Sequence, residues 1–358
     1  MAPVKKNAEI QKRASAEVQK SFNLADFKAK KGFGAENTKY KPQTWIPLSK
    51  AWQEATGLPG IPQGHITLLR GHSDTGKTTT LLECAAQCQK MGILPVLIIT
   101  EVKFSFTFAR NIGFQYEDIV DPETGEVTGH EGFFLYADRE TLNTIEDVAS
   151  YIADLLDEQE KGNLPYDLCF LWDSVGSVPC RMSVESKSNS NMWNAGALSQ
   201  QFGNYIDQKI ILTRKQSKKY TSTLVCVNKI WNVIENAFTG QVGIRNKGGE
   251  CLYYDASLVV NYGNPSSAGT AKLKCVADKK DYVWAKTTNV SIDKCHLGVV
   301  CNHGKIVMTP TGFISVASVE KYKKEHRAEW AKQLGSNEIE FVEEEESEDS
   351  GAGFTMLD

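Results

Sequence analysis

The sequence predicts an α/β protein whose central sheet is mainly parallel and flanked by helices. A glycine-rich segment at residues 71–78 follows a strand-like run and precedes a run with helical spacing. Two more apolar runs, residues 94–101 and 167–174, end in or next to a carboxylate, Glu101 and Asp173. Unbroken apolar runs are typical of strands that are covered on both faces, as they are in a parallel sheet.

The composition is that of a globular protein that folds without disulfides. Hydrophobic residues make up 41% of the 358 residues and charged residues 23%. No run is long and apolar enough to cross a membrane, and the basic N-terminus lacks the apolar block of a signal peptide. The nine cysteines form no C-x-x-C pair. We therefore expect a soluble, cytoplasmic protein with reduced, buried thiols and no zinc framework.

The two ends of the chain carry opposite charge. Residues 1–31 contain eight Lys/Arg and three Asp/Glu, whereas residues 338–358 contain nine Asp/Glu and no Lys/Arg. Apolar residues at helical spacing are interspersed with the N-terminal lysines. We predict a basic helical arm for oligomerisation in residues 1–44, an ATPase core in 45–320, and a short helix with a disordered acidic tail in 321–358. Two solvated ends without such roles are the alternative.

Residues 71–78 read G-x-x-x-x-G-K-[ST], the pattern of a phosphate-binding loop. Its glycines let several backbone N–H groups point at one spot, and the following helix adds the positive end of its dipole. Lys77 would hold the β- and γ-phosphates of ATP, and the Thr78 hydroxyl would bind Mg²⁺. The predicted ATP-binding residues of this loop are Gly71, His72, Ser73, Asp74, Thr75, Gly76, Lys77, Thr78 and Thr79.

Two carboxylates end apolar runs downstream of this loop. Glu101 would lie at the carboxyl end of a parallel strand, where α/β sheets bind ligands. It is a candidate general base that orients water towards the γ-phosphate, and an ordinary solvent-exposed glutamate is an equally good interpretation. Asp173 completes the Walker B pattern, an apolar strand ending in Asp, and would bind Mg²⁺ together with Thr78.

Further elements follow from hydrophobic periodicity and from turn residues. Helical patterns are expected at residues 140–161, at 197–212 and from about 320, and a surface hairpin around 121–130. Strands are expected at residues 224–228, 257–263, 271–277 and 295–301.

Two long polar stretches, residues 179–194 and 229–249, are predicted to be loops. Loops of this length inside a compact domain are usually functional or disordered. The second stretch combines glycines, cations and aromatic residues, a composition that suits a mobile loop gripping a phosphate backbone and contacting bases. A flexible surface loop is the alternative.

In this combination of motifs the chain resembles the RecA recombinases, and most of all their phage-encoded UvsX-type members. The resemblance is carried by Gly60-Ile61-Pro62-Gln63-Gly64, the phosphate loop, Glu101, Phe108-Ala109-Arg110, Trp172-Asp173-Ser174-Val175 and Gly248-Gly249. It covers roughly residues 45–300 and implies a RecA-like P-loop NTPase core. The chain departs from the family at Lys229, where Gln is common, and it is too short after residue 300 for a large C-terminal domain.

The resemblance implies roles that periodicity does not. Phe108 matches an aromatic residue that stacks on adenine, and Asn228 with Lys229 stands where the family senses the γ-phosphate. Lys279 and Lys280 are similar in position to lysines that reach a neighbouring subunit's ATP. The two predicted loops imply DNA-binding residues: Ser188, Asn189, Met192, Trp193, Trp231, Phe238, Arg245, Lys247, Gly248 and Gly249.

The function implied is that of a recombinase. Such a protein uses ATP and Mg²⁺ to form helical filaments of its own copies on single-stranded DNA, pairs them with double-stranded DNA and promotes strand exchange, with DNA-dependent ATP hydrolysis. A single-strand-binding protein or mediator would be a partner, and the location would be the cytoplasm, that of the host if the chain is phage-encoded. A RecA-fold ring helicase or motor ATPase and a nucleotide-gated DNA-binding scaffold are the alternatives.

Overall fold

The computed structural model describes residues 23–32, 39–101, 103–187, 191–236, 241–264, 270–336 and 338–342. The chain divides into two compact units: Met1–Pro42 with Arg214–Lys219, and Gln43–Thr213 with Tyr220–Asp358. The smaller unit contains α2 (Leu24–Lys30), whose first turn is capped by the Asn23 side chain. Of the predicted N-terminal arm, residues 1–22 and 33–38 lie outside the described residues, as does the acidic tail from residue 343.

The larger unit is built on one large sheet, with twelve strands in the described part of the chain. From edge to edge, its main path runs through β15 (Gly312–Ser315), β14 (His303–Thr309), β13 (Lys280–Cys295), β11 (Leu258–Tyr262), β3 (Ile66–Gly71), β9 (Ser222–Asn236), β8 (Leu168–Asp173), β4 (Leu94–Ile99) and β7 (Leu135–Asp138). The strands from β11 to β7 are parallel to their neighbours, and those from β13 to β15 are antiparallel. The predicted α/β class with a mostly parallel central sheet is confirmed.

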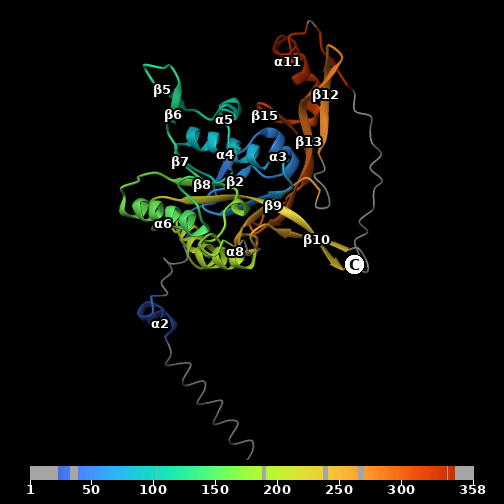
Figure 1. Cartoon of the computed structure of the whole chain (residues 1–358). Helices are drawn as coiled ribbons and strands as arrows, with labels where there is room; N and C mark the ends of the chain where they lie inside the picture. Colours follow the sequence, from blue (N-terminus) through green and yellow to red (C-terminus); the bar gives the residue numbers. More distant parts are fainter. Residues whose placement is uncertain are drawn as a thin grey trace, which may run out of the picture. The chain divides into compact units, whose positions relative to one another are not determined.

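Helices cover both faces of the parallel strands, which explains their unbroken apolar runs. On one face α3 (Lys50–Thr56), α4 (Lys77–Met91) and α5 (Phe106–Ile112) pack on Leu69, Leu97 and Val225. The other face carries α6 (Ile145–Lys161), α8 (Asn191–Leu198) and α9 (Asp207–Leu212), packed on neighbours such as Leu68 and Leu224. Figure 1 shows α4 and α5 on the opposite side of the sheet from α6 and α8.

Strand register brings the predicted site residues to one edge. Residues Gly71 and Lys229 are partners across β3 and β9, and Ile99 and Asp173 are partners across β4 and β8. Because all four strands run in the same direction, the segments that follow them emerge together at the carboxyl edge of the sheet.

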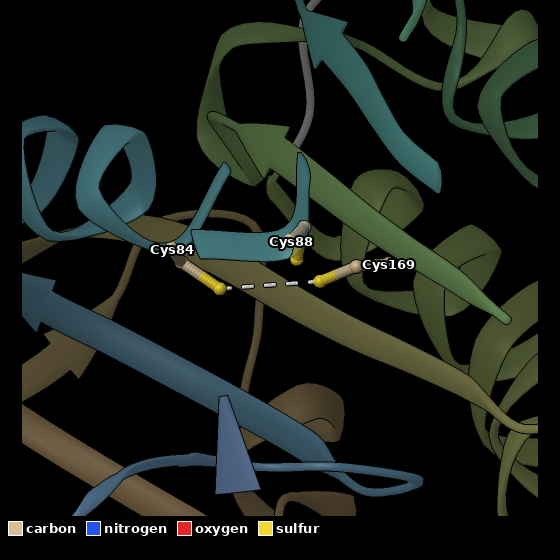
Figure 2. A group of neighbouring side chains, drawn as sticks. All are labelled: Cys84, Cys88 and Cys169. Carbon is tan, nitrogen blue, oxygen red and sulfur yellow. Dashed lines mark hydrogen bonds between the residues drawn. The ribbon is translucent and has the colours of Figure 1, made fainter. Parts of the chain in front are cut away.

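The nine cysteines are free thiols, and six of them are buried. Cys84 and Cys88 of α4 face Cys169 of β8, and Figure 2 shows the three sulfur atoms directed towards one another. The Sγ atoms of Cys84 and Cys169 are 4.0 Å apart. These thiols are part of the core between α4 and the sheet, as expected for small, weakly polar side chains.

The segment after residue 228 is a hairpin, which corrects the prediction of a loop over 229–249. Strand β9 continues to Asn236 and pairs in antiparallel fashion with β10 (Gln241–Asn246). The sequence from Lys229 onward has β-branched residues at Ile230, Val233 and Ile234, so strand propensity extends past the buried part of β9. The glycines and cations of this stretch are typical of a loop, which is why a loop is predicted there.

The stretch 179–194 is also less irregular than predicted, since a short helix, α7 (Arg181–Glu185), occupies part of it and α8 begins at Asn191. The predicted strand at 295–301 is wrong. β13 ends at Cys295, β14 begins at His303, and the residues between them form no strand. The strand in this region is the sixteen-residue β13, which ends where the predicted strand begins, and the predicted range falls in the turn that contains Gly298.

The other predicted elements are confirmed with small shifts in their bounds. The surface hairpin is β5 (Glu117–Val120) with β6 (Val127–Glu131), and the helix at 140–161 is α6, which starts with a capping box. The helix at 197–212 is α8 and α9, joined by a π-helical segment at Ser199–Ile206. β12 (Ala271–Ala277) and α11 (Val319–Gln333) complete an outer cluster around Trp284. No helix among the described residues is both long and apolar enough to span a membrane.

Candidate functional site

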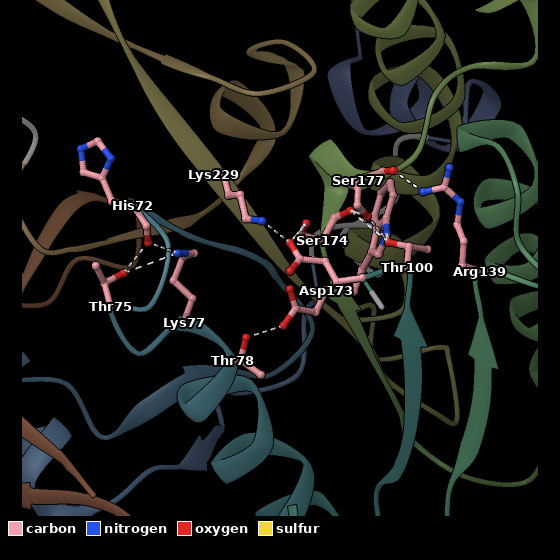
Figure 3. Close-up of polar contacts among 12 residues, drawn as sticks. His72, Thr75, Lys77, Thr78, Thr100, Arg139, Asp173, Ser174, Ser177 and Lys229 are labelled. Atoms are coloured by element: carbon pink, nitrogen blue, oxygen red, sulfur yellow. Dashed lines mark hydrogen bonds and ion pairs between the residues drawn. The ribbon is translucent and has the colours of Figure 1, made fainter. Parts of the chain in front are cut away.

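The phosphate-binding loop joins β3 to α4, as the motif requires. Gly76 has φ 105°, and a Cβ there would lie 2.8 Å from the sulfur of Met308, so a larger residue would be both strained and crowded. The Lys77 ammonium lies 2.5 Å from the His72 carbonyl oxygen and 3.4 Å from the Thr75 hydroxyl. Figure 3 shows the lysine folded back over the loop.

Lys77 is a buried cation. Only 5% of the residue is exposed, and this burial lowers the pKa of its ammonium to about 8, with the nearby Lys229 acting in the same direction and Asp173 opposing it. The loop therefore holds a positive charge that water does not stabilise. A phosphate anion at this position would supply the missing counter-charge.

Thr78 and Asp173 form the second part of the site. The Thr78 hydroxyl donates a hydrogen bond of 2.6 Å to Oδ2 of Asp173 (Figure 3). Burial raises the pKa of Asp173 to about 6, and the bond from Thr78 opposes that rise. A hydroxyl and a desolvated carboxylate are hard oxygen ligands, so the pair fits Mg²⁺.

Glu101 lies in the same site and not on the open surface. Its Oε1 accepts a 2.6 Å hydrogen bond from the Ser174 hydroxyl and forms a 2.9 Å ion pair with the Lys229 ammonium. Burial alone would raise the pKa of Glu101, but the bonds from Ser174 and Lys229 outweigh it and lower the pKa. Glu101 is therefore an ionised carboxylate that is held by two donors.

These residues surround a cavity of about 740 Å³, whose lining includes Ser73, Asp74, Lys77, Thr78, Glu101, Phe108, Asp173, Lys229 and Lys247. A second cavity, of about 320 Å³, lies between residues 74–79 and strands β13 and β14. Phe108 lines both cavities. The volumes are in the range of small-molecule sites. Phe104 also lines the larger cavity and Trp284 the smaller one.

Three site residues were missed by the sequence reasoning. Arg139 follows β7 and donates to the Ser177 carbonyl, and both residues line the larger cavity (Figure 3). Lys286 of β13 forms an ion pair with Asp74 of the phosphate loop and lines the smaller cavity. Arg139 could have been predicted, because it directly follows another parallel strand at the same edge. No pattern in the sequence places Lys286 beside the phosphate loop.

Asn228 links the site to the β9–β10 hairpin. Its side-chain nitrogen donates a 3.0 Å hydrogen bond to the Lys247 carbonyl, and the Lys247 amide donates to the Lys229 carbonyl. The Asn228 side-chain oxygen is buried without a hydrogen-bond donor among the described residues. The two ends of the hairpin are thus fastened to each other directly beside Glu101.

The predicted DNA-binding residues that the structure describes lie on and around this hairpin. Trp231 and Lys247 line a further cavity of about 440 Å³, with Gly248, Arg139 and residues of the 176–194 segment. Met192 is 76% exposed, Arg245 is exposed, and Trp193 packs on the core. Gly249 packs closely on Ala195. Ser188, Asn189 and Phe238 lie outside the described residues.

Lys279 and Lys280 lie at the tight turn between β12 and β13. Asp278 and Lys279 have φ of 50° and 64°, which is the left-handed conformation of a two-residue hairpin turn. Both lysines are exposed, and neither lines the cavities beside the phosphate loop of the same chain.

Comparison with known proteins shows a similarity over the first third of the chain. A model described as the RecA N-terminal domain matches residues 12–131. Protein RecA of Ureaplasma parvum serovar 3 is 37% identical over 75 residues, which is 20% of this chain and 22% of that protein. The matched segment thus spans about a fifth of the length of this relative. The parallel sheet and the strand–loop–helix at residues 66–91 agree with these matches, which show that this part of the chain is similar to the RecA N-terminal domain.

Proposed function

We propose that the protein is a DNA-dependent ATPase that forms helical filaments on single-stranded DNA and promotes homologous pairing and strand exchange. The observation that carries the ATPase is the meeting of Lys77, Thr78, Asp173 and Glu101 at the carboxyl edge of a parallel sheet. Filament formation and strand exchange rest on the family, and the UvsX-like phage origin and host-cytoplasmic location remain part of the proposal.

The residues of the site divide the work of ATP hydrolysis among them. The amides of residues 71–79 and the Lys77 ammonium would hold the phosphates, and Phe108 would stack on adenine. Thr78 and Asp173 would hold Mg²⁺, which when bound neutralises phosphate charge. Glu101 would orient the attacking water and accept its proton.

Lys229 gives this site a built-in restraint. Its ammonium and the Ser174 hydroxyl both contact Oε1 of Glu101, the group that would receive the proton. A γ-phosphate would compete with Glu101 for Lys229 and so release the carboxylate. Because Lys229 is at the base of the β9–β10 hairpin, its displacement would also change the hairpin. Lys229, aided by Asn228, would thereby couple nucleotide to DNA, the role that Gln has in relatives.

The hairpin side of the site is the proposed DNA-binding surface. Lys247 and the exposed Arg245 would neutralise phosphates, and the 47% exposed Trp231 would stack on a base. Ser188, Asn189, Met192, Trp193, Phe238, Gly248 and Gly249 complete the proposed set. Lys279 and Lys280, exposed on their turn, would reach the ATP of a neighbouring subunit.

The parts of the chain outside the core have proposed roles in assembly. The arm in residues 1–44 would pack on the next subunit, residues 45–320 would form the ATPase core, and residues 321–358 would compete with DNA for basic surface. Double-stranded DNA and a single-strand-binding protein or mediator would be further partners. A ring helicase or motor ATPase and a nucleotide-gated scaffold remain the competing functions, and no feature of the site favours either of them.

Electron microscopy with an ATP analogue and single-stranded DNA tests the proposal, together with ATPase and strand-exchange assays with and without DNA. Open filaments and DNA-stimulated hydrolysis are expected. Closed rings would indicate a motor, and nucleotide-dependent DNA binding without hydrolysis would indicate a scaffold. A protein that ignored ATP would overturn all three.

A further inference from the structure

A second group of ligand atoms lies on the face of the sheet away from the phosphate loop. Asp207 opens α9, and Cys251 and Asp255 are the first and last residues of α10 (Cys251–Asp255). One carboxylate oxygen of each Asp and the Cys251 sulfur all lie within 4.8 Å of one another. We call these three residues the Asp207 cluster.

Asp207 is an unsatisfied buried carboxylate. Only 3% of the residue is exposed, and neither carboxylate oxygen has a hydrogen-bond donor among the described residues. Buried polar groups in proteins are almost always hydrogen-bonded, because an unpaired one costs the full desolvation penalty. In its ionised form Asp207 would need a cation to offset that penalty.

The surrounding described residues do not supply that cation. The Cys251 thiol points to Oδ2 of Asp255 at 3.1 Å. Lys294 of β13 is near Asp255, but its ammonium donates to the carbonyls of Tyr253 and Tyr254 at 3.0 and 2.6 Å. Lys209 of α9 is paired with Asp157, and the neighbouring Cys226 is a buried thiol whose pKa is raised by burial.

The backbone beside the cluster approaches it closely, because Gly203 has no side chain. A Cβ on Gly203 would lie 3.0 Å from the Cys251 sulfur and 3.2 Å from Oδ2 of Asp255. Gly203 belongs to the π-helical segment Ser199–Ile206, which ends directly before Asp207. π-Helical segments are rare and are frequently found at functional sites.

We propose that the Asp207 cluster binds a divalent metal ion, with Zn²⁺ as the best match. Two carboxylate oxygens and one thiolate are ligands that zinc accepts, whereas Mg²⁺ requires an all-oxygen set. Binding would release to solvent the thiol proton of Cys251 and the proton held between the carboxyl groups of Asp207 and Asp255. The fourth position would be open to water.

The metal would join the elements that follow the two proposed DNA-binding segments, and this consequence rests on the proposed function. The π-helical segment and α9 come after residues 179–194, and α10 begins two residues after Gly249. A metal bound to all three ligands would fix α9 and α10 to each other, and so set the spacing of the segments before them.

Zinc content measures the site directly. The full-length protein is dialysed against micromolar Zn²⁺ with excess Mg²⁺ and no nucleotide, and bound zinc is counted by mass spectrometry of the metal. Asp207→Asn, Asp255→Asn and Cys251→Ala are each expected to lose one zinc per chain. Asp154→Asn, an exposed carboxylate on α6, is the matched control. Cys169→Ala controls for the thiols of Figure 2, and both controls should keep that zinc.

Thermal unfolding provides a readout that does not depend on stoichiometry. Zinc should raise the Tm of the wild type and of Asp154→Asn, and should leave the Tm of Asp207→Asn unchanged. Equal zinc content in Asp207→Asn and wild type, or a wild type that takes up no zinc, would show that the two carboxyl groups share only a proton, and the proposal would be abandoned. Zinc binding without ATPase activity would refute the proposed function and leave the metal site standing.

Discussion

Asp173 and Asp207 are two aspartates buried to a similar degree on opposite faces of one sheet, at 6% and 3% exposure. Asp173 accepts a hydrogen bond from Thr78 and lies near the Lys77 ammonium, and its pKa is raised only to about 6. Asp207 has no hydrogen-bond donor among the residues that the structure describes and lies beside Asp255, and its pKa is raised to about 8. The comparison teaches that partners, more than depth, decide how far burial raises the pKa of a carboxyl group.

The largest effect is expected at the phosphate loop. Lys77→Ala removes the cation that stabilises transferred phosphoryl charge, and should lower kcat for ATP by about 10³-fold or more, with an unchanged circular dichroism spectrum. Lys90→Ala, an exposed lysine at the end of the same helix, is the control. Hydrolysis at the wild-type rate in Lys77→Ala would show that the site formed by Lys77, Thr78 and Asp173 does not hydrolyse ATP.

Glu101→Gln separates catalysis from binding at the same edge. The amide cannot accept the proton of the attacking water, so kcat should fall by about 10²- to 10⁴-fold. Affinity for a fluorescent ATP analogue should stay within about threefold, since Lys77, Thr78 and Asp173 remain. If Glu101→Gln hydrolyses ATP at the wild-type rate, Glu101 is not the general base and is an ordinary polar residue of the site.

Asp207→Asn and Asp173→Asn test the comparison itself through pH. Folding raises both pKa values above the unfolded value of 3.8, so the folded protein binds the proton more tightly and its free energy of unfolding falls as pH rises. The decrease in the free energy of unfolding that is due to Asp173 should end near pH 6. The decrease that is due to Asp207 should continue to about pH 8.

In metal-free buffer Asp207→Asn should therefore be more stable than wild type at pH 8, by about 1 to 3 kcal/mol. The advantage should shrink steadily towards pH 5. Asp173→Asn should show a smaller gain that is constant above pH 7. Urea unfolding at several pH values measures the free energy of unfolding of both variants. If this free energy depended on pH in the same way in Asp173→Asn and Asp207→Asn, the two aspartates would not differ in pKa as stated.

Lys229→Met sharpens the link between nucleotide and hairpin. It removes the ion pair with Glu101 and keeps a side chain of similar length, so hydrolysis without DNA should rise and the stimulation by DNA should fall about fivefold. Lys229→Arg keeps the charge and should keep most of the stimulation. An unchanged ratio of the hydrolysis rates with and without DNA in Lys229→Met would mean that the ion pair has no coupling role.

The smallest effect is expected on the hairpin. Arg245→Gln should weaken binding to single-stranded DNA severalfold and lower the slope of log affinity against log salt by about 0.7, the value for one lost phosphate contact. Fluorescence anisotropy over a salt series measures it, and Lys90→Gln serves as the charge-matched control. An unaltered slope would place the DNA elsewhere.

Local sequence patterns were enough to predict which residues lie at the carboxyl edge of the parallel strands. The loop at residues 71–78 and the acids after the apolar runs are local patterns, because a strand end, a glycine turn and a helix start are set by neighbouring residues. The same approach failed where two patterns overlap: β9 continues through Lys229 as a strand although its composition is that of a loop. It also failed at β13, whose length exceeds the window in which strands are usually sought.

The sequence by itself determined the fold class and the place of the phosphate-loop motif between a strand and a helix, since both depend on short-range spacing. Only the tertiary structure decided that Lys229 restrains Glu101, that Lys286 pairs with Asp74, and that Asp207 meets Asp255. These contacts join strands and helices that are remote along the chain, and strand order and register, which follow from the packing of the whole core, decide which side chains meet.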